Sequence, residues 1–157
     1  KFNLLIFRYI YIMKKILKFI LDFSDKNNLQ SIGLLILRIG ASLSLMTHGY
    51  GKLIRFEERS ATFMSHLSLG SEVSLSLVIF AEFICPIFIL LGLGTRIFSI
   101  PIIYTFIIIV FDIHIDDPFS KMEKGILFLT IYSTIFLSGP GKFSIDTFLK
   151  KKLKIKN

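Results

Sequence analysis

Four stretches of the sequence are long, apolar and almost free of charge, and they constrain the fold more than any other feature. They cover about residues 31–50, 73–93, 97–115 and 122–138. A helix of about 20 apolar residues is long enough to cross the hydrocarbon core of a bilayer. The sequence therefore predicts an all-α integral membrane protein, an antiparallel four-helix bundle over residues 31–141.

The alternative is a soluble bundle of very apolar helices. Hydrophobic residues make up 53% of the 157 residues, and the mean hydropathy is +0.69. Four such runs in one short chain are hard to hide from water, so the membrane interpretation is favoured. Four spans leave no room for a separate soluble catalytic domain.

Few residues suit disulfide or metal chemistry. Cys85 is the only cysteine, which excludes an intrachain disulfide. Three histidines and one cysteine do not favour a zinc site with the usual four nitrogen or sulfur ligands, so we predict no metal.

Basic residues at both ends predict the orientation. Of the 19 Lys and Arg residues, six precede residue 31 and six follow residue 139. Cytoplasmic flanks are enriched in these residues. We therefore expect both termini in the cytoplasm, with a basic segment over residues 1–30 and a basic tail over 142–157. The basic tails carry no nucleic-acid recognition motif, so we expect the lipid bilayer as the partner and no nucleic acid.

The N-terminal segment has two further features. Residues 14–23 have the pattern of a short amphipathic helix that lies at the membrane interface. Met13 is a more natural start than Lys1, which leaves open whether residues 1–12 are native.

In this topology, ionisable side chains from three predicted helices fall at the outer end of the bundle. They are His48, Lys52, Asp112, His114, Glu123 and Lys124. Charged groups inside a membrane are costly, so they tend to face protein or water and to be functional. The sequence predicts a polar site at the outer face. The alternative for most of these residues is a position among the lipid headgroups.

Glu82 lies near the middle of the second run, where it cannot easily extend to either surface. Arg38 is its candidate partner, although Arg38 can also extend to the inner phosphates. Pro86 cannot donate the helical hydrogen bond to the Glu82 carbonyl. The result is either a small polar cavity at mid-depth or a simple packing kink.

Asp112 and His114 are about 200° apart around a helix, so they cannot face the same way. Asp112 shares a helical face with Thr105, and we expect this face to point into the bundle. His114 is then left at another interface or among the headgroups.

The ordered set of motifs resembles the DoxX family of small four-helix membrane proteins. The matching pieces are Leu37-Arg38, His48-Gly49, Lys52, Ala81-Glu82, Leu91 to Arg96, His114, Glu123, Ser138 to Gly141 and Ser144-Ile145-Asp146. The acidic Asp116-Asp117-Pro118 loop departs from the pattern. The resemblance implies a four-helix bundle in the bacterial cytoplasmic membrane. It also implies a link to redox complexes, among which are subunits of a thiosulfate:quinone oxidoreductase.

Two functions remain open from the sequence. The first is a redox-associated subunit with a quinone-sized cavity, which works with other redox subunits or a second copy. His48, Glu82 and Asp112 are then the candidates for handling protons. The candidate contacts to a quinone are Arg38, His48, Lys52, Glu82, His114 and Glu123. The second is a non-catalytic membrane scaffold, in which polar residues only hold the helices together. A small-solute or proton pathway is a weaker third hypothesis. The spacing of His48 and His114 does not support haem.

Overall fold

The computed structural model describes residues 8–15 and 27–153, and every regular element in these ranges is helical. Residues 8–15 form a short helix. Most of the interfacial helix expected over 14–23 lies outside the described residues. The remaining elements are α2 (Asn27–Leu53), α3 (Phe56–Ser60), α4 (Ser71–Ile79), η1 (Phe80–Ile84), α5 (Cys85–Leu91), α6 (Thr95–Ile108), η2 (Ile109–Ile113), α7 (Phe119–Ser138) and α8 (Ile145–Lys152).

Three helices of the described chain are long and apolar enough to cross a membrane: Asn28–Leu53, Ser71–Leu91 and Thr95–Ile113. They confirm the first three predicted runs and make this chain a multi-pass membrane protein. The fourth run lies in α7, which is a helix of 20 residues. Helix α7 differs from the other three helices in composition, because it carries three charged residues near its start: Lys121, Glu123 and Lys124.

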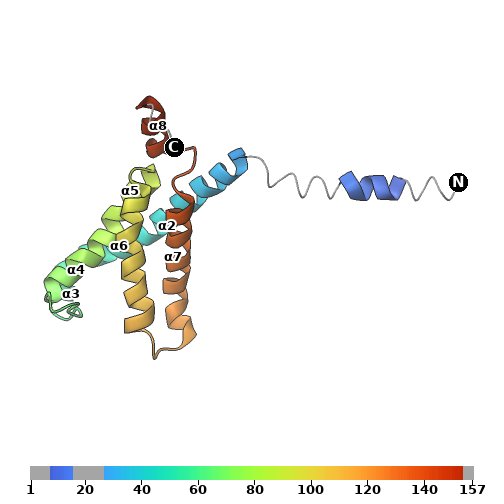
Figure 1. Cartoon of the computed structure of the whole chain (residues 1–157). Helices are drawn as coiled ribbons and strands as arrows, with labels where there is room; N and C mark the ends of the chain where they lie inside the picture. Colours follow the sequence, from blue (N-terminus) through green and yellow to red (C-terminus); the bar gives the residue numbers. More distant parts are fainter. Residues whose placement is uncertain (1–7, 16–26, 154–157) are drawn as a thin grey trace.

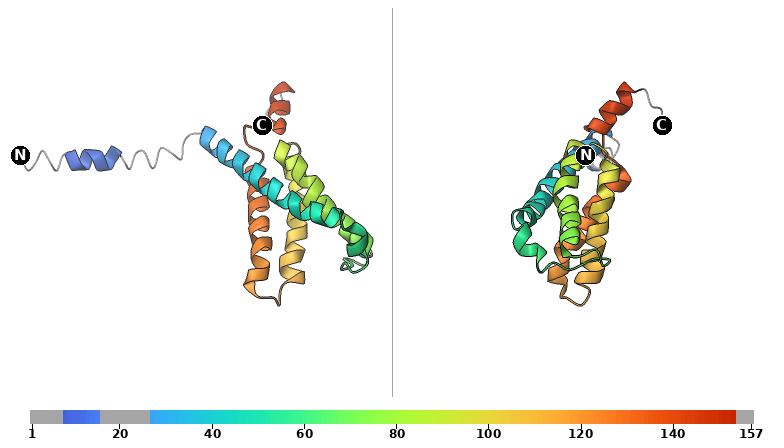
Figure 2. Two further views of the ribbon diagram at one scale, coloured as in Figure 1. Left: turned by 180° about the vertical axis from the view of Figure 1, so that it is seen from behind. Right: turned by 90° about the vertical axis from the view of Figure 1, so that its left-hand side faces the viewer.

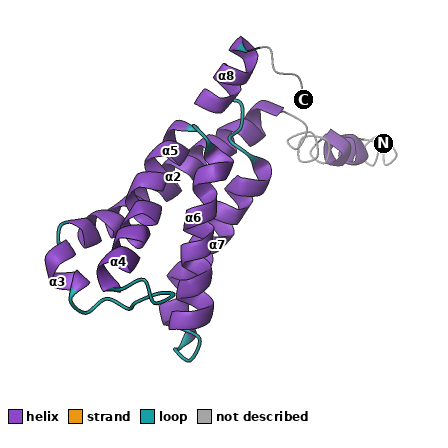
Figure 3. Cartoon of the chain, turned by 60° about the vertical axis from the view of Figure 1, so that its left-hand side comes forward, coloured by secondary structure: helices purple, strands orange, loops and turns teal. Residues whose placement is uncertain are grey.

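The helices form an elongated bundle (Figure 1). Helices α6 and α7 lie side by side and run in opposite directions, while α2 crosses them obliquely and packs along α5 and η1 (Figures 1 and 2). We call the end that carries the α5–α6 connection and α8 the turn end. The opposite end carries residues 54–70 and 114–118, and we call it the loop end (Figure 3).

Side chains of all the long helices meet in the centre of the bundle. The buried core includes Leu45, Cys85, Ile89, Ile102 and Tyr132. Large apolar side chains such as Ile36, Ile97 and Leu137 are exposed on the outside of the bundle. An apolar exterior around a packed interior suits a chain whose surroundings are lipid, since the apolar side chains then avoid water.

Two wide π-helical turns interrupt the long helices. The first, η1, ends where the Cys85 N–H donates to the Phe80 carbonyl. Pro86 follows directly and has no N–H to donate, so the regular ladder cannot continue through this point. The second, η2, ends where the His114 N–H donates to the Ile109 carbonyl over 3.1 Å. Single π turns of this kind occur frequently at functional sites.

Gly49 lets α2 approach the first π turn closely. A Cβ atom at Gly49 would lie 2.7 Å from the Glu82 carbonyl carbon and 2.8 Å from its oxygen. Contacts this short do not occur for real side chains, so the crossing of α2 over η1 requires glycine here. The close approach brings the following turn of α2, which carries Lys52, next to Glu82.

Candidate functional site

A buried ion pair joins α2 to the first π turn. Glu82 is only 2% exposed, and Lys52 Nζ donates to Glu82 Oε2. The Lys52 side chain is 21% exposed and so keeps one side open. The prediction that Glu82 lies inside the bundle is confirmed, but the prediction that Arg38 is its partner is wrong. The oblique path of α2 brings its last turns against η1, while Arg38 lies at the turn end.

A cavity of about 470 Å³ lies beside this ion pair at the loop end. Its walls are α4 and η1 on one side and α6 and η2 on the other, and part of the 54–70 segment covers it. It is lined by Lys52, Phe63, Met64, His66, Ser74, Leu77, Val78, Phe80, Ala81, Pro101, Tyr104, Thr105, Ile108, Ile109, Ile113 and His114. A mostly apolar cavity of this size with a few polar groups is typical of small-molecule sites.

The covering loop is fixed to both walls by hydrogen bonds. His66 Nε2 lies 2.9 Å from the Tyr104 hydroxyl of α6. The His66 backbone N–H donates to Ser74 Oγ over 2.9 Å, and Ser74 Oγ donates to the Gly70 carbonyl over 2.7 Å. The loop therefore places an imidazole and a phenol side by side at the cavity wall. The sequence did not indicate this pair, because no sequence pattern links positions 66 and 104.

His114 lines the cavity from the end of η2 and is held by the next turn of chain. Its Nδ1 lies 2.7 Å from Asp117 Oδ2, and Lys121 Nζ donates to Asp117 Oδ1 over 2.7 Å. The hydrogen bonds from His114 and then Lys121 hold the pKa of the Asp117 carboxyl below its usual value, because they stabilise the carboxylate. Asp117 belongs to the acidic loop that departs from the family pattern.

The other residues predicted at the outer face do not line the cavity. His48 is exposed and packs edge-on against Phe128 of α7, with ring centroids 5.8 Å apart. Glu123 and Lys124 are exposed on the first turns of α7. All three lie toward the loop end, as the topology predicts, but only Lys52 and His114 of the six reach the cavity.

Asp112 is exposed, so the prediction that it faces the bundle is wrong. Thr105, which was expected to share its face, is buried and lines the cavity. The π turn η2 begins after Thr105 and contains Asp112. A π turn advances fewer degrees per residue than an α turn, so it rotates Asp112 away from the face that carries Thr105.

Arg38 occupies a different site at the turn end. It is 1% exposed, and its guanidinium donates to the backbone carbonyls of Pro140, Leu90 (3.2 Å) and Phe143 (3.1 Å). The predicted alternatives, pairing with Glu82 or extending to the lipid phosphates, are therefore both wrong. Gly92 is required beside this group, because its φ is +70° and a Cβ atom there would lie 2.5 Å from the Cβ of Ser144. Arg38 fastens α2 to α5 and to the segment after α7.

Asp146 closes the same end of the bundle. Its carboxylate accepts from the backbone N–H groups of Gly94 (2.8 Å) and Thr95 (3.1 Å), and its own N–H donates to the Gly92 carbonyl (2.9 Å). The residues that sequence analysis assigned to a basic tail thus include a cap for the start of α6. The sequence signal was present only as part of the Ser144-Ile145-Asp146 motif.

These features define a small helical multi-pass membrane protein with a mostly apolar cavity, which carries a few polar groups, at one end and a tight turn at the other. The model of the DoxX family matches residues 33–115. The chain belongs to the DoxX family, as its motifs predict. The matched region runs from α2 to the end of the third apolar helix, and it contains Arg38, Lys52, Glu82, His66 and Tyr104. No curated protein and no solved structure matches the chain.

Proposed function

We propose that this DoxX protein is a quinone-linked subunit of a membrane oxidoreductase system in the bacterial cytoplasmic membrane. The observation that carries the proposal is the cavity of about 470 Å³ between α4–η1 and α6–η2. A quinone headgroup is a flat apolar ring with two carbonyl oxygens. Such a ligand suits an apolar cavity that presents a few hydrogen-bond donors.

The cavity lining offers such donors from several elements. Tyr104 of α6 and His66 of the covering loop form one pair, Lys52 comes from the last turn of α2, and His114 lies at the end of η2. Tyr104, His66 and Lys52 would hold the quinone oxygens by hydrogen bonds. A bound quinone supplies a carrier for two electrons and two protons, and the imidazoles of His66 and His114 can hold protons beside it.

Glu82 acts through Lys52 in this proposal. Its carboxylate lies behind the cavity wall, where it fixes the position of the lysine that faces the cavity. Glu82 is therefore a positioning residue. Three other residues that the sequence indicated as candidates lie outside the cavity: His48, Asp112 and Glu123. They would contribute only through contacts with another subunit or a second copy.

The orientation forms part of the same proposal. We infer that α7 crosses the bilayer as a fourth span and that the turn end, with both termini, lies in the cytoplasm. The support is the Lys and Arg content of the two ends of the sequence and of α8, whose last turn is Lys150, Lys151 and Lys152. The cavity then opens toward the periplasmic half of the bilayer.

Quinone retention tests the site. The protein is purified in mild detergent, its lipids are extracted, and quinone is measured per mole of protein by chromatography. We expect quinone to copurify and to fall at least tenfold in the Tyr104→Phe and Glu82→Gln variants. Glu123→Gln is the matched control, because this exposed carboxylate lies at the same end but outside the cavity. Equal quinone in all three variants would exclude binding in this cavity.

The scaffold remains the second candidate, and a specific observation favours it. The buried charged groups of the described chain, Arg38 and Glu82, both hold helices together in contacts that need no ligand. If the wild-type protein retains no quinone and instead copurifies with another membrane protein in fixed ratio, the scaffold function is correct and the redox role is not.

Orientation is tested independently with Ser68→Cys and Lys151→Cys variants. The native Cys85 is buried and gives little background. A membrane-impermeant maleimide added to spheroplasts should label Ser68→Cys and leave Lys151→Cys unlabelled until the cells are lysed. The reverse labelling pattern would invert the topology.

A further inference from the structure

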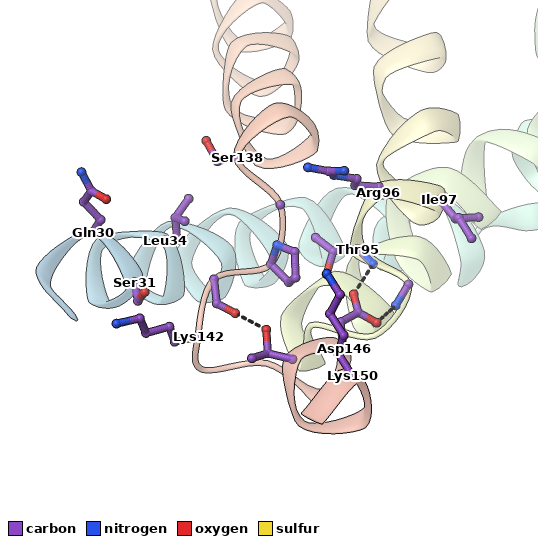
Figure 4. Close-up of a pocket in the computed structure, with 15 residues that line it drawn as sticks. Gln30, Ser31, Leu34, Thr95, Arg96, Ile97, Ser138, Lys142, Asp146 and Lys150 are labelled. Carbon is purple, nitrogen blue, oxygen red and sulfur yellow. Dashed lines mark hydrogen bonds between the residues drawn. The ribbon is translucent and has the colours of Figure 1, made fainter. Parts of the chain in front are cut away.

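A second cavity, of about 600 Å³, lies at the turn end (Figure 4). It is bounded by the start of α2, the start of α6, the segment after α7 and α8. This cavity is far from the quinone cavity along the bundle, so the inference about it rests on the proposed orientation but not on the proposed redox role.

Basic side chains from three different elements line this cavity. Arg96 comes from α6, Lys142 from the segment after α7, and Lys150 from α8. Lys142 Nζ donates to Asn28 Oδ1 over 3.1 Å, and Arg96 donates weakly to the Leu137 carbonyl over 3.4 Å. Arg96 and Lys142 are both exposed. The acceptors in these two hydrogen bonds are a carbonyl and an amide oxygen, neither of which carries a charge. The cavity is therefore strongly electropositive at its rim.

The one carboxylate of the cavity is already engaged. Asp146 accepts hydrogen bonds from the backbone of Gly94 and Thr95 with both of its oxygens (Figure 4). Its charge offsets part of the positive charge, but the basic side chains outnumber it by three to one. The net field favours an anion.

The rest of the wall combines neutral polar side chains, such as those of Gln30 and Thr147, with glycines and a few apolar side chains. Leu34 and Ile97 border the cavity, and Ile97 is 70% exposed on the outside of α6. At Gly139, which has a φ of +75°, a Cβ atom would lie 3.6 Å from the Arg96 guanidinium. Because Gly139 has no side chain, the space beside the Arg96 guanidinium stays open to the cavity. An anionic head can therefore sit among the cations while an apolar tail continues along Ile97 on the outside of α6.

We propose that this cavity binds the phosphate-bearing headgroup of an anionic phospholipid. Arg96 and Lys142 hold the phosphate from two sides, and the acyl chains lie against the apolar surface of α6. Basic cavities between membrane helices at the cytoplasmic level suit such headgroups. Arg96 lies in the first turn of α6, and Lys142 lies shortly after the end of α7. A headgroup bound to both would therefore connect the start of α6 to the end of α7.

Lipid titration of the delipidated full chain, followed by native mass spectrometry in detergent, tests this site. The probes are phosphatidylglycerol, phosphatidylcholine and inorganic phosphate. The test variant is Arg96→Gln/Lys142→Gln. The matched control is Lys151→Gln/Lys152→Gln, which removes the same charge from the same end at exposed positions outside the cavity. Thermal melting of each variant checks that it is folded.

We expect one phosphatidylglycerol to bind per chain, more tightly than phosphatidylcholine. Its Kd should rise on the order of 30-fold in the test variant, as expected for two basic groups near a membrane surface, and less than threefold in the control. Arg96→Lys/Lys142→Arg should restore binding. Equal losses in test and control variants, or equal binding of phosphatidylcholine, would overturn the site. Displacement of the lipid by millimolar phosphate would show a site for free anions and would also overturn the proposal.

Discussion

At the turn end the buried Arg38 donates to three backbone carbonyls, whereas at the loop end the buried Glu82 is met by a single lysine side chain. Backbone carbonyls cannot swing away, so the first arrangement fixes the helices in one position. A lysine on a flexible stem can exchange its partner for another acceptor. The comparison teaches that one end of this bundle is built for rigidity, while the other keeps a charge beside a cavity where a ligand can compete for it.

Replacing Arg38 should have the largest effect. Arg38→Leu leaves three part-buried carbonyls without this donor, and each unsatisfied buried group costs about 1–3 kcal/mol. We expect the free energy of unfolding to fall by about 3 kcal/mol or more, measured by thermal melting in detergent and by the yield of monodisperse protein. Arg55→Leu, at an exposed position, should change it by less than about 0.5 kcal/mol. Similar losses in both variants would mean that Arg38 does not fasten the turn end.

Breaking the Lys52–Glu82 pair comes next in size. Lys52→Met leaves the Glu82 carboxylate buried without a partner, and we expect a loss of about 2–3 kcal/mol because Lys52 is partly exposed. Lys52→Met/Glu82→Gln should recover most of that loss, since no buried charge then remains. A double-mutant cycle on the free energy of unfolding measures the coupling. Additive single effects within about 0.5 kcal/mol would contradict a direct interaction.

Gly49 lies where α2 crosses η1, and its small size keeps Lys52 next to Glu82. In Gly49→Ala the added methyl group would meet the Glu82 backbone at 2.7 Å, which forces α2 away from η1 and moves Lys52 from its partner. Overpacking of this kind costs about 1–3 kcal/mol. Gly40→Ala is the matched control on the same helix, because no atom lies within 4 Å of its added Cβ. It should leave stability unchanged or raise it by about 0.5–1 kcal/mol. Equal thermal stability of the two variants would show that the crossing tolerates a side chain.

The sequence was sufficient to predict the apolar helices, because hydropathy and charge spacing are local properties. The three membrane helices begin and end within three residues of their predicted limits. The tight connection at Gly94 is also confirmed: the residue has a φ of +59°, which glycine adopts at no steric cost. The interior position of Glu82 followed from its distance to both helix ends.

The partners of the buried charges could not be predicted in the same way. Depth along a straight helix suggested Arg38 for Glu82, but α2 crosses obliquely and places Lys52 there instead. The inward orientation predicted for Asp112 failed because η2 changes the helical period between Thr105 and Asp112. The contact of His66 with Tyr104 depends on how an irregular loop folds back over the bundle. Each of these outcomes is set by tertiary packing, which a helical wheel does not contain.

The smallest predicted effect concerns acid at the loop end. The hydrogen bonds from His114 and Lys121 lower the pKa of the Asp117 carboxyl, so Asp117 contributes to stability above its unfolded value of about 3.9. This contribution disappears as the pH falls through the lower, folded pKa. Carbon NMR of the labelled carboxyl should give a midpoint below about 3.9. His114→Gln should raise this midpoint most and Lys121→Gln less, while Lys124→Gln, whose side chain is exposed on the next turns, should leave it unchanged. An unchanged midpoint in His114→Gln would mean that His114 is not held by Asp117. His114 would then be free to turn at the cavity wall, and the contrast between a fixed turn end and an adaptable loop end would become sharper.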